Sequence, residues 1–307
     1  MKHYTHVYLA NKAVEFLWDS VDNLSYRSGS LARSSVRRRV KGGAADLQRI
    51  LRSHMDRIEE ASWAPDDILY DMKTFHIYKL MMADEFTDYQ DFVAEEFKVG
   101  GKTYYKVNGG GGLPYKIDHL ARLLADMVKL RAYNDIFTME HICYLFFLLS
   151  HYIADANVPM HTDVRDDKPS RKKPQNGNYY STKWHGKIEK LWEKGSTPIA
   201  LRENIIPSER KGCNSVDTNM TPFLKFYLKP NVKDIHTTYL KPNQLIKYMQ
   251  TVCAHSKDRS VILFPVSNPD NFSEAKLEGM SHDIFADAIG SIISVWLAIW
   301  DHAFADD

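Results

Sequence analysis

The chain has 307 residues, of which 44% are hydrophobic, which is enough for one large domain or two ordinary ones with a substantial core. Its 40 basic and 39 acidic residues leave a formal charge of +1, and this near-neutrality weakens a role in holding nucleic acid by bulk electrostatics without excluding it. Three widely separated cysteines, Cys143, Cys213 and Cys253, form neither a disulfide framework nor a Cys-x-x-Cys zinc site.

The N-terminal sequence MKHYTHVYLANKAVEF lacks the apolar stretch of a secretory signal peptide. The most apolar run near the C-terminus, residues 288–300 between Asp287 and Asp301, is too short to cross a bilayer and is better interpreted as a buried helix. We therefore predict no transmembrane segment. The compartment stays open: cytoplasmic if Met1 is the native start, secreted if an upstream signal has been removed.

Helical periodicity dominates the rest of the chain. Apolar residues recur every three or four positions in four segments, 11–21, 46–62, 115–133 and 272–304. A short hairpin is predicted at 97–107, a flexible glycine-rich stretch at 106–115 and a polar loop at 166–178. The sequence therefore predicts an all-α fold in a single domain, residues 1–307.

The segment HYIADANVPMH (151–161) follows the apolar run CYLFFLLS. His151 and Asp155 are four residues apart, so they share one helix face, and the apolar sequence indicates that this face looks inward. A bare carboxylate there is costly unless it is neutralised. Pro159 cannot continue the helix, so the chain turns and brings His161 near the helix end. These residues are candidate metal ligands.

The segment KWHGKIEKLWE (183–193) repeats this arrangement, with His185 and Glu189 again four residues apart. Imidazole and carboxylate ligands are typical of zinc sites. A single pair of this kind is more often a core histidine, or a surface carboxylate beside a lysine. Together, the two segments predict a metal site.

HYIADANVPMH followed by WHGKIE resembles the zinc-dependent phospholipase C family of bacteria and the related single-strand-specific nucleases of fungi and plants. The resemblance implies an all-helical fold around a cluster of three zinc ions. THVYLANKAVEFL (5–17) looks like the family's first helix, which opens with a ligand histidine, here His6.

SWAPDDILYDMKTFH (62–76) is similar to the family's next ligand-bearing element, and Asp66 and His76 match its ligands. On its own, Asp66 after Pro65 is equally typical of a helix N-terminus. The resemblance is scattered over residues 1–193.

The resemblance implies two to three zinc ions per chain. Asp66, His76, His151 and Asp155 would hold the first; His161, His185 and Glu189 the second, with an open position for water or substrate; and His6, the bridging Asp155 and the amine of Met1 the third, with His3 as an alternative to Met1.

Two or three zinc ions held by only three carboxylates keep a net positive charge, which suits an anionic phosphodiester as substrate. Zinc also supplies an activated water. We therefore predict a zinc-dependent phosphodiesterase in which Asp66 orients or deprotonates the attacking water. The His-x3-Glu ending and the neutral charge favour a phospholipase C-like enzyme acting on a phospholipid or similar ester. Asp67 stands where some phospholipases carry a choline-caging tyrosine, so the head group stays open.

Two alternatives remain. The long step from His161 to His185 is closer to the spacing of the nucleases, which favours a single-strand-specific nuclease or nucleotidase. Basic and aromatic residues in that step suit a single-stranded nucleic acid, although a solvated loop is the simpler interpretation. They are Arg165, Arg171, Lys172, Lys173, Tyr179 and Tyr180. The other alternative is a non-catalytic zinc-binding protein. No protein partner is predicted.

Overall fold

A computed structural model of the chain describes residues 1–25, 32–69, 71–134, 137–166, 173–174, 177–193 and 230–304. The predicted predominance of helix is confirmed. The α-helices are α1 (His3–Phe16), α2 (Ala32–Arg52), α3 (Ile58–Asp67), α4 (Leu113–Asn134), α5 (Met139–Ala156), α6 (Pro159–Thr162), α7 (Lys183–Trp192), α9 (Leu245–Leu263) and α10 (Glu274–Phe304).

Short 3₁₀ helices and strands connect them. The 3₁₀ helices are η1 (Asp19–Asn23), η2 (Met55–Arg57), η3 (Lys73–Phe75), η4 (Ala83–Glu85), η5 (Gln90–Phe92), η6 (Val164–Asp166), η8 (Val232–Asp234) and η9 (Pro242–Gln244). The strands are β1 (Leu24–Ser25), β2 (Leu80–Met81), β3 (Val93–Val99), β4 (Lys102–Val107) and β5 (Thr237–Thr238). β1 and β5 pair in parallel, and β4 lies between β2 and β3 in an antiparallel sheet.

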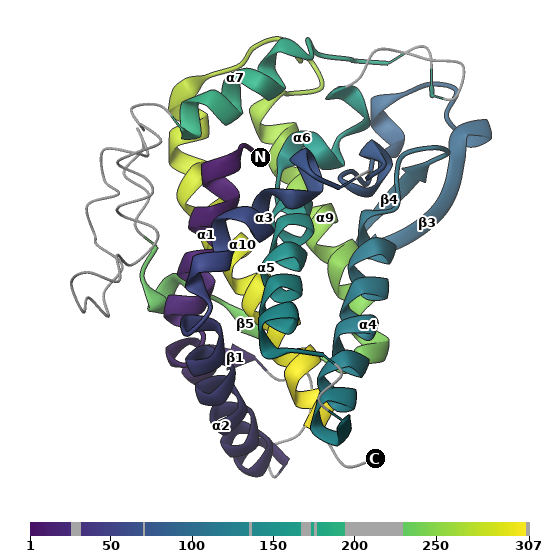
Figure 1. The fold of residues 1–307 in the computed structure, drawn as a ribbon. Helices are drawn as coiled ribbons and strands as arrows, with labels where there is room; N and C mark the ends of the chain where they lie inside the picture. Colours follow the sequence, from purple (N-terminus) through teal and green to yellow (C-terminus); the bar gives the residue numbers. More distant parts are fainter. Residues whose placement is uncertain are drawn as a thin grey trace.

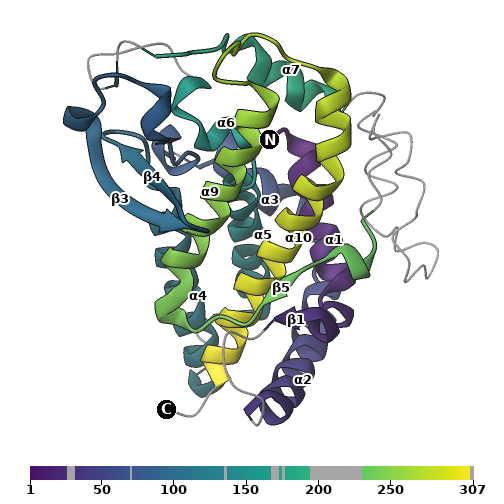
Figure 2. The ribbon, with the colours of Figure 1, turned by 180° about the vertical axis from the view of Figure 1, so that it is seen from behind.

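Helix α5 lies at the centre of the fold (Figures 1 and 2) and contacts α1, α3, α4, α9 and α10. It begins at Thr138, whose hydroxyl accepts the backbone N–H of His141 at 3.2 Å. Fully buried Trp296 of α10 packs against Phe146 and Phe147 and donates its indole N–H to the Phe146 carbonyl at 3.1 Å. The apolar face of α5 is thereby covered, and its C-terminal end carries His151 and Asp155 toward one end of the bundle.

Helix α10 matches the segment 272–304 in which helical periodicity was predicted. By length and composition alone it is able to cross a membrane, but 89% of its most apolar window is buried inside the protein. Burial of that kind is typical of a core helix. The larger of two hydrophobic clusters includes residues from Met1 to Ala303, while the assignment of 1–307 to one domain stays a prediction.

The segment predicted as one helix over 46–62 is divided between α2 and α3. At the break, the Ser53 hydroxyl lies 2.7 Å and the His54 imidazole Nδ1 3.0 Å from the carbonyl of Ile50, competing for a carbonyl that helix continuation uses. Pro65 lies inside α3 near its C-terminal end. The interpretation of Asp66 as a helix N-terminal residue is therefore wrong.

The predicted hairpin is confirmed as β3 and β4, which turn through Gly100 and Gly101 at φ values of 57° and 81°. β4 is attached to α9 through Asp258, which accepts hydrogen bonds at 2.9 Å from Tyr104 and Lys102.

Strand β2, which pairs with β4, connects the hairpin to α6 and to the residue after it. Leu80 pairs with Asp163 in an isolated bridge, and the backbone N–H of Tyr78 donates to the carbonyl of His161 at 3.1 Å. The hairpin side of the molecule thus positions the segment that follows α5.

Four charged side chains form a buried network that fixes the same segment. Lys257 of α9 lies 2.6 Å from Glu85 and 2.7 Å from Asp163, and Arg165 lies 2.8 Å from Asp163. Each is at most 2% exposed. Buried charges are tolerated because each faces an opposite charge.

This burial bears on the predicted nucleic-acid contact. Arg165 and Tyr180 are buried, and Lys173 is 9% exposed, so these side chains are not presented to a single strand. Tyr179 donates its hydroxyl to the carbonyl of Pro174. Arg171 and Lys172 lie outside the described residues, as does Cys213.

Candidate metal centre

The nine residues predicted as metal ligands converge at one end of the bundle. They come from six places in the chain: the N-terminal end of α1, the end of α3, the residue after η3, the last turn of α5, α6 and α7. In both ribbon views the N-terminus lies near α6, below α7 (Figures 1 and 2). Eight of the nine form three groups of donor atoms, the first two of which share His151: His6, His151 and Asp155; Asp66, His76 and His151; and His161, His185 and Glu189.

The first predicted ligand set has the spacing of a four-coordinate site. His76 Nδ1 lies 3.2 Å from His151 Nε2 and 2.9 Å from Asp155 Oδ2. His151 Nε2 lies 3.3 Å from Asp155 Oδ2. Asp66 Oδ1 lies 3.6 Å from both imidazole nitrogens. Zinc bonds of 2.0–2.1 Å in a tetrahedron separate neighbouring ligand atoms by about 3.3 Å. The separations of Asp66 and of Asp155 from the two imidazoles, and of the imidazoles from each other, are close to this value.

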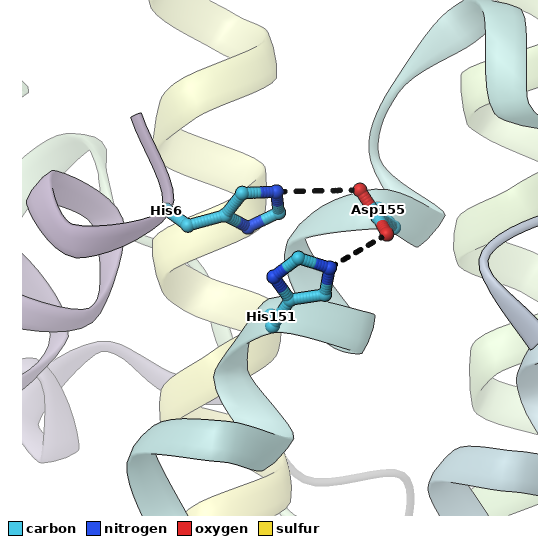
Figure 3. Close-up of side chains that lie close together, drawn as sticks. All are labelled: His6, His151 and Asp155. Atoms are coloured by element: carbon cyan, nitrogen blue, oxygen red, sulfur yellow. Dashed lines mark ion pairs between the residues drawn. The ribbon is translucent and has the colours of Figure 1, made fainter. Parts of the chain in front are cut away.

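Asp155 faces two sites through its two oxygens. Its Oδ2 belongs to the first set, while its Oδ1 lies 3.5 Å from His6 Nε2, 3.3 Å from His161 Nδ1 and 3.2 Å from the amine of Met1. Figure 3 shows His6 and His151 on opposite oxygens of this carboxylate. The predicted bridging position of Asp155 agrees with this geometry.

The second predicted set centres on two imidazoles. His161 Nε2 lies 3.1 Å from His185 Nε2, which lies 3.2 Å from Glu189 Oε1. The structure adds that His161 faces two sites, because its Nδ1 points to Asp155. The amine of Met1 also lies between sites, 3.2 Å from both Asp155 and Glu189.

His3, the alternative to Met1, is placed elsewhere. Its ring stacks between Tyr4 and Trp63, with centroid distances of 4.5 and 5.0 Å, and its Nε2 lies 3.8 Å from Glu59. Among the described residues it belongs to none of the three groups of donor atoms. The geometry therefore favours Met1 over His3.

The site's electrostatics keep two imidazoles neutral. Burial lowers the pKa of His6 and of His161 well below the ordinary value, and the nearby Met1 amine acts in the same direction. Burial alone would raise the pKa of Asp155, but the Met1 amine and the surrounding histidines hold it well below its usual range. A buried carboxylate that stays ionised beside neutral imidazoles is a natural cation ligand.

Two other imidazoles behave differently in the absence of an ion. Burial lowers the pKa of His151, but Asp155 and Asp66 outweigh it and raise the pKa to about 9. For His185, Asp166 and Glu189 likewise outweigh burial and raise the pKa to about 9. Both rings are held beside carboxylates that favour a positive charge, whether a proton or a metal supplies it.

Unsatisfied donor atoms test whether the residues fit a metal. Both ring nitrogens of His6 and Nδ1 of His161 are buried without a hydrogen-bond partner. His151 donates Nδ1–H to the carbonyl of Ser62 at 2.9 Å, so in its neutral form Nε2 presents a lone pair to Asp66 and Asp155. Lone pairs gathered around one point in a buried site are costly unless a cation lies between them. The donor set therefore fits zinc.

Sequence reasoning missed the residues that orient the ligands. Asp166 Oδ2 lies 2.9 Å from His185 Nδ1, and Asp71 accepts the hydroxyl of Tyr152 while lying 3.6 Å from His76 Nε2. Asp166 lies outside the motifs that identified the ligands, and Asp71 lies within the segment 62–76 but was not assigned a role there. Only the pairing of distant segments shows their role.

Comparisons with known proteins support the fold. No protein-family model and no curated protein matches the chain. Among solved structures, the alpha-toxin of an avian strain of Clostridium perfringens is 12% identical with a TM-score of 0.51, over 100% of this chain and 66% of that one. The alpha-toxin of Clostridium absonum is 14% identical with a TM-score of 0.50, over 99% of this chain and 65% of that one. The chain thus spans slightly less than two thirds of either toxin, and it has the alpha-toxin fold.

Proposed function

We propose that the chain is a zinc-dependent phosphoric ester hydrolase, phospholipase C-like, that cleaves a phosphodiester with an activated water. The observation that carries the proposal is the convergence of eight predicted ligands into three neighbouring donor groups, with buried, unpaired imidazole nitrogens on His6 and His161. A fold that resembles that of zinc phospholipase C supports it.

The three donor groups would hold two to three zinc ions, as assigned from the resemblance. Zinc bound here would lower the pKa of water to about 7 and offset negative charge on a phosphate. No cysteine among the described residues belongs to the groups, and Cys143 and Cys253 are buried elsewhere. Ligand sets of histidine and carboxylate with a position left open for water are typical of catalytic sites.

Of the two carboxylates Asp66 and Asp155, Asp66 is the better placed to contact an attacking water. Its side chain is 31% exposed, whereas that of Asp155 is 1% exposed. Asp66 Oδ1 is oriented by His76 and His151, and the carboxylate is able to accept the proton of an attacking water. Asp155, closed off from solvent, holds the ligand sets together.

The substrate class follows from charge. Three ligand carboxylates do not neutralise two or three divalent ions, so the loaded site would attract an anion such as a phosphodiester. Asp67, next to Asp66, is exposed and suits a substrate with a cationic group beside the phosphate. The nuclease alternative gains no further support from the two described basic residues on which it was based, because Arg165 and Lys173 are buried.

Zinc content and substrate choice test the proposal together. We expect two to three zinc ions per chain by elemental analysis after dialysis. We also expect hydrolysis of a chromogenic phosphocholine ester and of phosphatidylcholine vesicles in preference to single-stranded DNA and to a phosphomonoester.

The other outcomes either support one of the alternatives or contradict the proposal. Preference for DNA or a nucleotide would support the nuclease or nucleotidase. Bound zinc without hydrolysis of any of these esters would support a non-catalytic zinc protein. A protein that binds no zinc would contradict the proposal.

A further inference from the structure

In the second candidate site, the His185 imidazole has a partner outside the predicted ligand set. His185 Nδ1 lies 2.9 Å from Oδ2 of Asp166, the last residue of η6. If the ring donates this proton, its Nε2 presents a lone pair toward His161 and Glu189. Asp166 thus selects the form of His185 that is able to bind a metal through Nε2.

A buried lysine holds Asp166 in turn. Lys79, immediately before β2, is 4% exposed, and its ammonium lies 3.5 Å from the same Oδ2 of Asp166. The ammonium also donates to the carbonyl of Met160 at 2.5 Å. Met160 directly precedes His161. One ammonium therefore contacts both the carboxylate beside the His185 imidazole and the backbone carbonyl before His161.

The surrounding backbone fixes this lysine. Its own N–H donates to the carbonyl of Gly110 at 2.6 Å, and its neighbour Tyr78 donates to the carbonyl of His161 at 3.1 Å. The position of Lys79 relative to α6 is therefore set by backbone pairing and does not depend on a flexible side chain alone.

We propose that Lys79 and Asp166 form a positioning pair for the second candidate metal site, holding His161 and His185 in the geometry that binds one zinc ion. The pair acts through the ligands and contacts neither metal nor substrate. The inference rests on the proposed function in taking His161, His185 and Glu189 as ligands.

The first candidate site has orienting partners of its own. In the first site His151 is oriented by the Ser62 carbonyl at 2.9 Å, and His76 faces Asp71. Loss of Asp166 therefore leaves the orienting partners of the first site in place. Loss of a partner that orients a ligand typically weakens metal affinity by about 10–100-fold.

The test measures zinc affinity site by site. Wild type, Asp166→Asn and Lys79→Gln are titrated with zinc against a chromogenic chelator, and zinc content is determined after dialysis. Asn is isosteric with Asp, and Gln retains a donor for the Met160 carbonyl. Asp234→Asn is the matched control, because Asp234 lies 3.6 Å from the imidazole of His282 at the surface.

We expect both variants to retain the tightest zinc ion and to bind another about 10–100-fold more weakly, with one fewer ion after dialysis. Cobalt substitution should show a changed visible spectrum for that ion alone. Asp234→Asn should match wild type.

Unchanged affinity and content in both variants would overturn the inference while leaving the proposed function intact. Equal weakening of every ion, in variants with native circular dichroism, would overturn it too, because the effect would not be specific to one site. Wild type without zinc would contradict the proposed function itself. If Asp166→Asn does not fold, Lys79→Gln decides.

Discussion

At the residue scale, Asp155 lies between two of the candidate ligand sets. One of its oxygens faces His76 and His151, and the other faces His6, His161 and the amine of Met1. A residue shared between sites has a larger effect when changed than a residue that serves one site.

We therefore expect Asp155→Asn to remove at least two zinc ions and to lower hydrolysis by about 10³-fold or more, equivalent to about 4 kcal/mol of transition-state stabilisation. Asp118→Asn is the control. Asp118 is also buried, at 9% exposed, but it accepts a hydrogen bond from Arg122 on α4 and lies outside the donor groups. Zinc analysis and steady-state kinetics measure the effect. Full zinc content and activity in Asp155→Asn would refute the bridging role.

The raised pKa values of His151 and His185, each about 9, predict opposite pH responses with and without zinc. In the chelated protein their protonation contributes stability that is fully present below the unfolded value of 6.5 and is lost as pH rises through 9. The Met1 amine, with its pKa raised to about 10, acts in the same direction. His6 and His161, with lowered pKa values, are neutral in this range and contribute nothing to it.

The melting temperature of the chelated protein should therefore fall between pH 7 and pH 9.5. Zinc affinity should rise over the same interval, because zinc displaces these protons. Each pKa unit corresponds to about 1.4 kcal/mol. Differential scanning calorimetry with chelator and with buffered zinc measures both. A melting temperature of the chelated protein that increases with pH would contradict this assignment.

The proximity of candidate ligands within compact motifs was predictable from the sequence, and the residues that contact them from other segments were not. The i, i+4 pairs His151–Asp155 and His185–Glu189 lie on single helices, so local geometry brings them together. Asp166 and Lys79 meet only because β2 pairs with the segment after α6, a contact between residues far apart in the chain. No local period encodes such a contact.

At the element scale, the glycine run before α4 has a packing role, although the sequence predicted only flexibility. Gly111 has φ of 93°, and a Cβ there would lie 2.2 Å from the carbonyl of Ile77. Gly112 donates its N–H to the carbonyl of Thr74 at 2.9 Å, so the run lies directly against the segment that carries His76.

We expect Gly111→Ala to destabilise the protein by about 2 kcal/mol or more, since the residue combines a positive φ with a backbone clash. Because the clash displaces the segment of His76, zinc affinity should fall as well. Gly112→Ala is the matched control, because nothing lies within 4 Å of its added Cβ and the backbone N–H is kept. Urea unfolding and zinc titration compare the two. Equal behaviour of both variants would show that the close approach of Gly111 is unimportant.

The sequence predicted the boundary of an element correctly where a glycine or a proline at that boundary determines it. The hairpin turn at Gly100 and Gly101 and the end of α5 before Pro159 match their predicted places. The break between α2 and α3 does not, because side chains of Ser53 and His54 compete for a backbone carbonyl within an otherwise continuous apolar pattern.

At the scale of the whole molecule, the ligand cluster joins the N-terminus to helices α3, α5, α6 and α7. The elements that supply its ligands would be held in one body by ions that bind only the folded chain. Folding and zinc binding are then linked, and each tenfold increase in free zinc above the dissociation constant adds about 1.4 kcal/mol of stability per ion.

Thermal unfolding at a series of free zinc concentrations therefore shows how many zinc ions bind only to the folded chain. We expect one cooperative transition, as the predicted single domain implies, with a free energy of unfolding that rises by about 3–4 kcal/mol per tenfold zinc for two to three ions. Magnesium at the same concentrations is the control, because it prefers oxygen ligands in an octahedron. A transition that zinc does not move would show that the cluster binds no ion. Two transitions, only one of them dependent on zinc, would contradict the single domain and confine the metal centre to part of the chain.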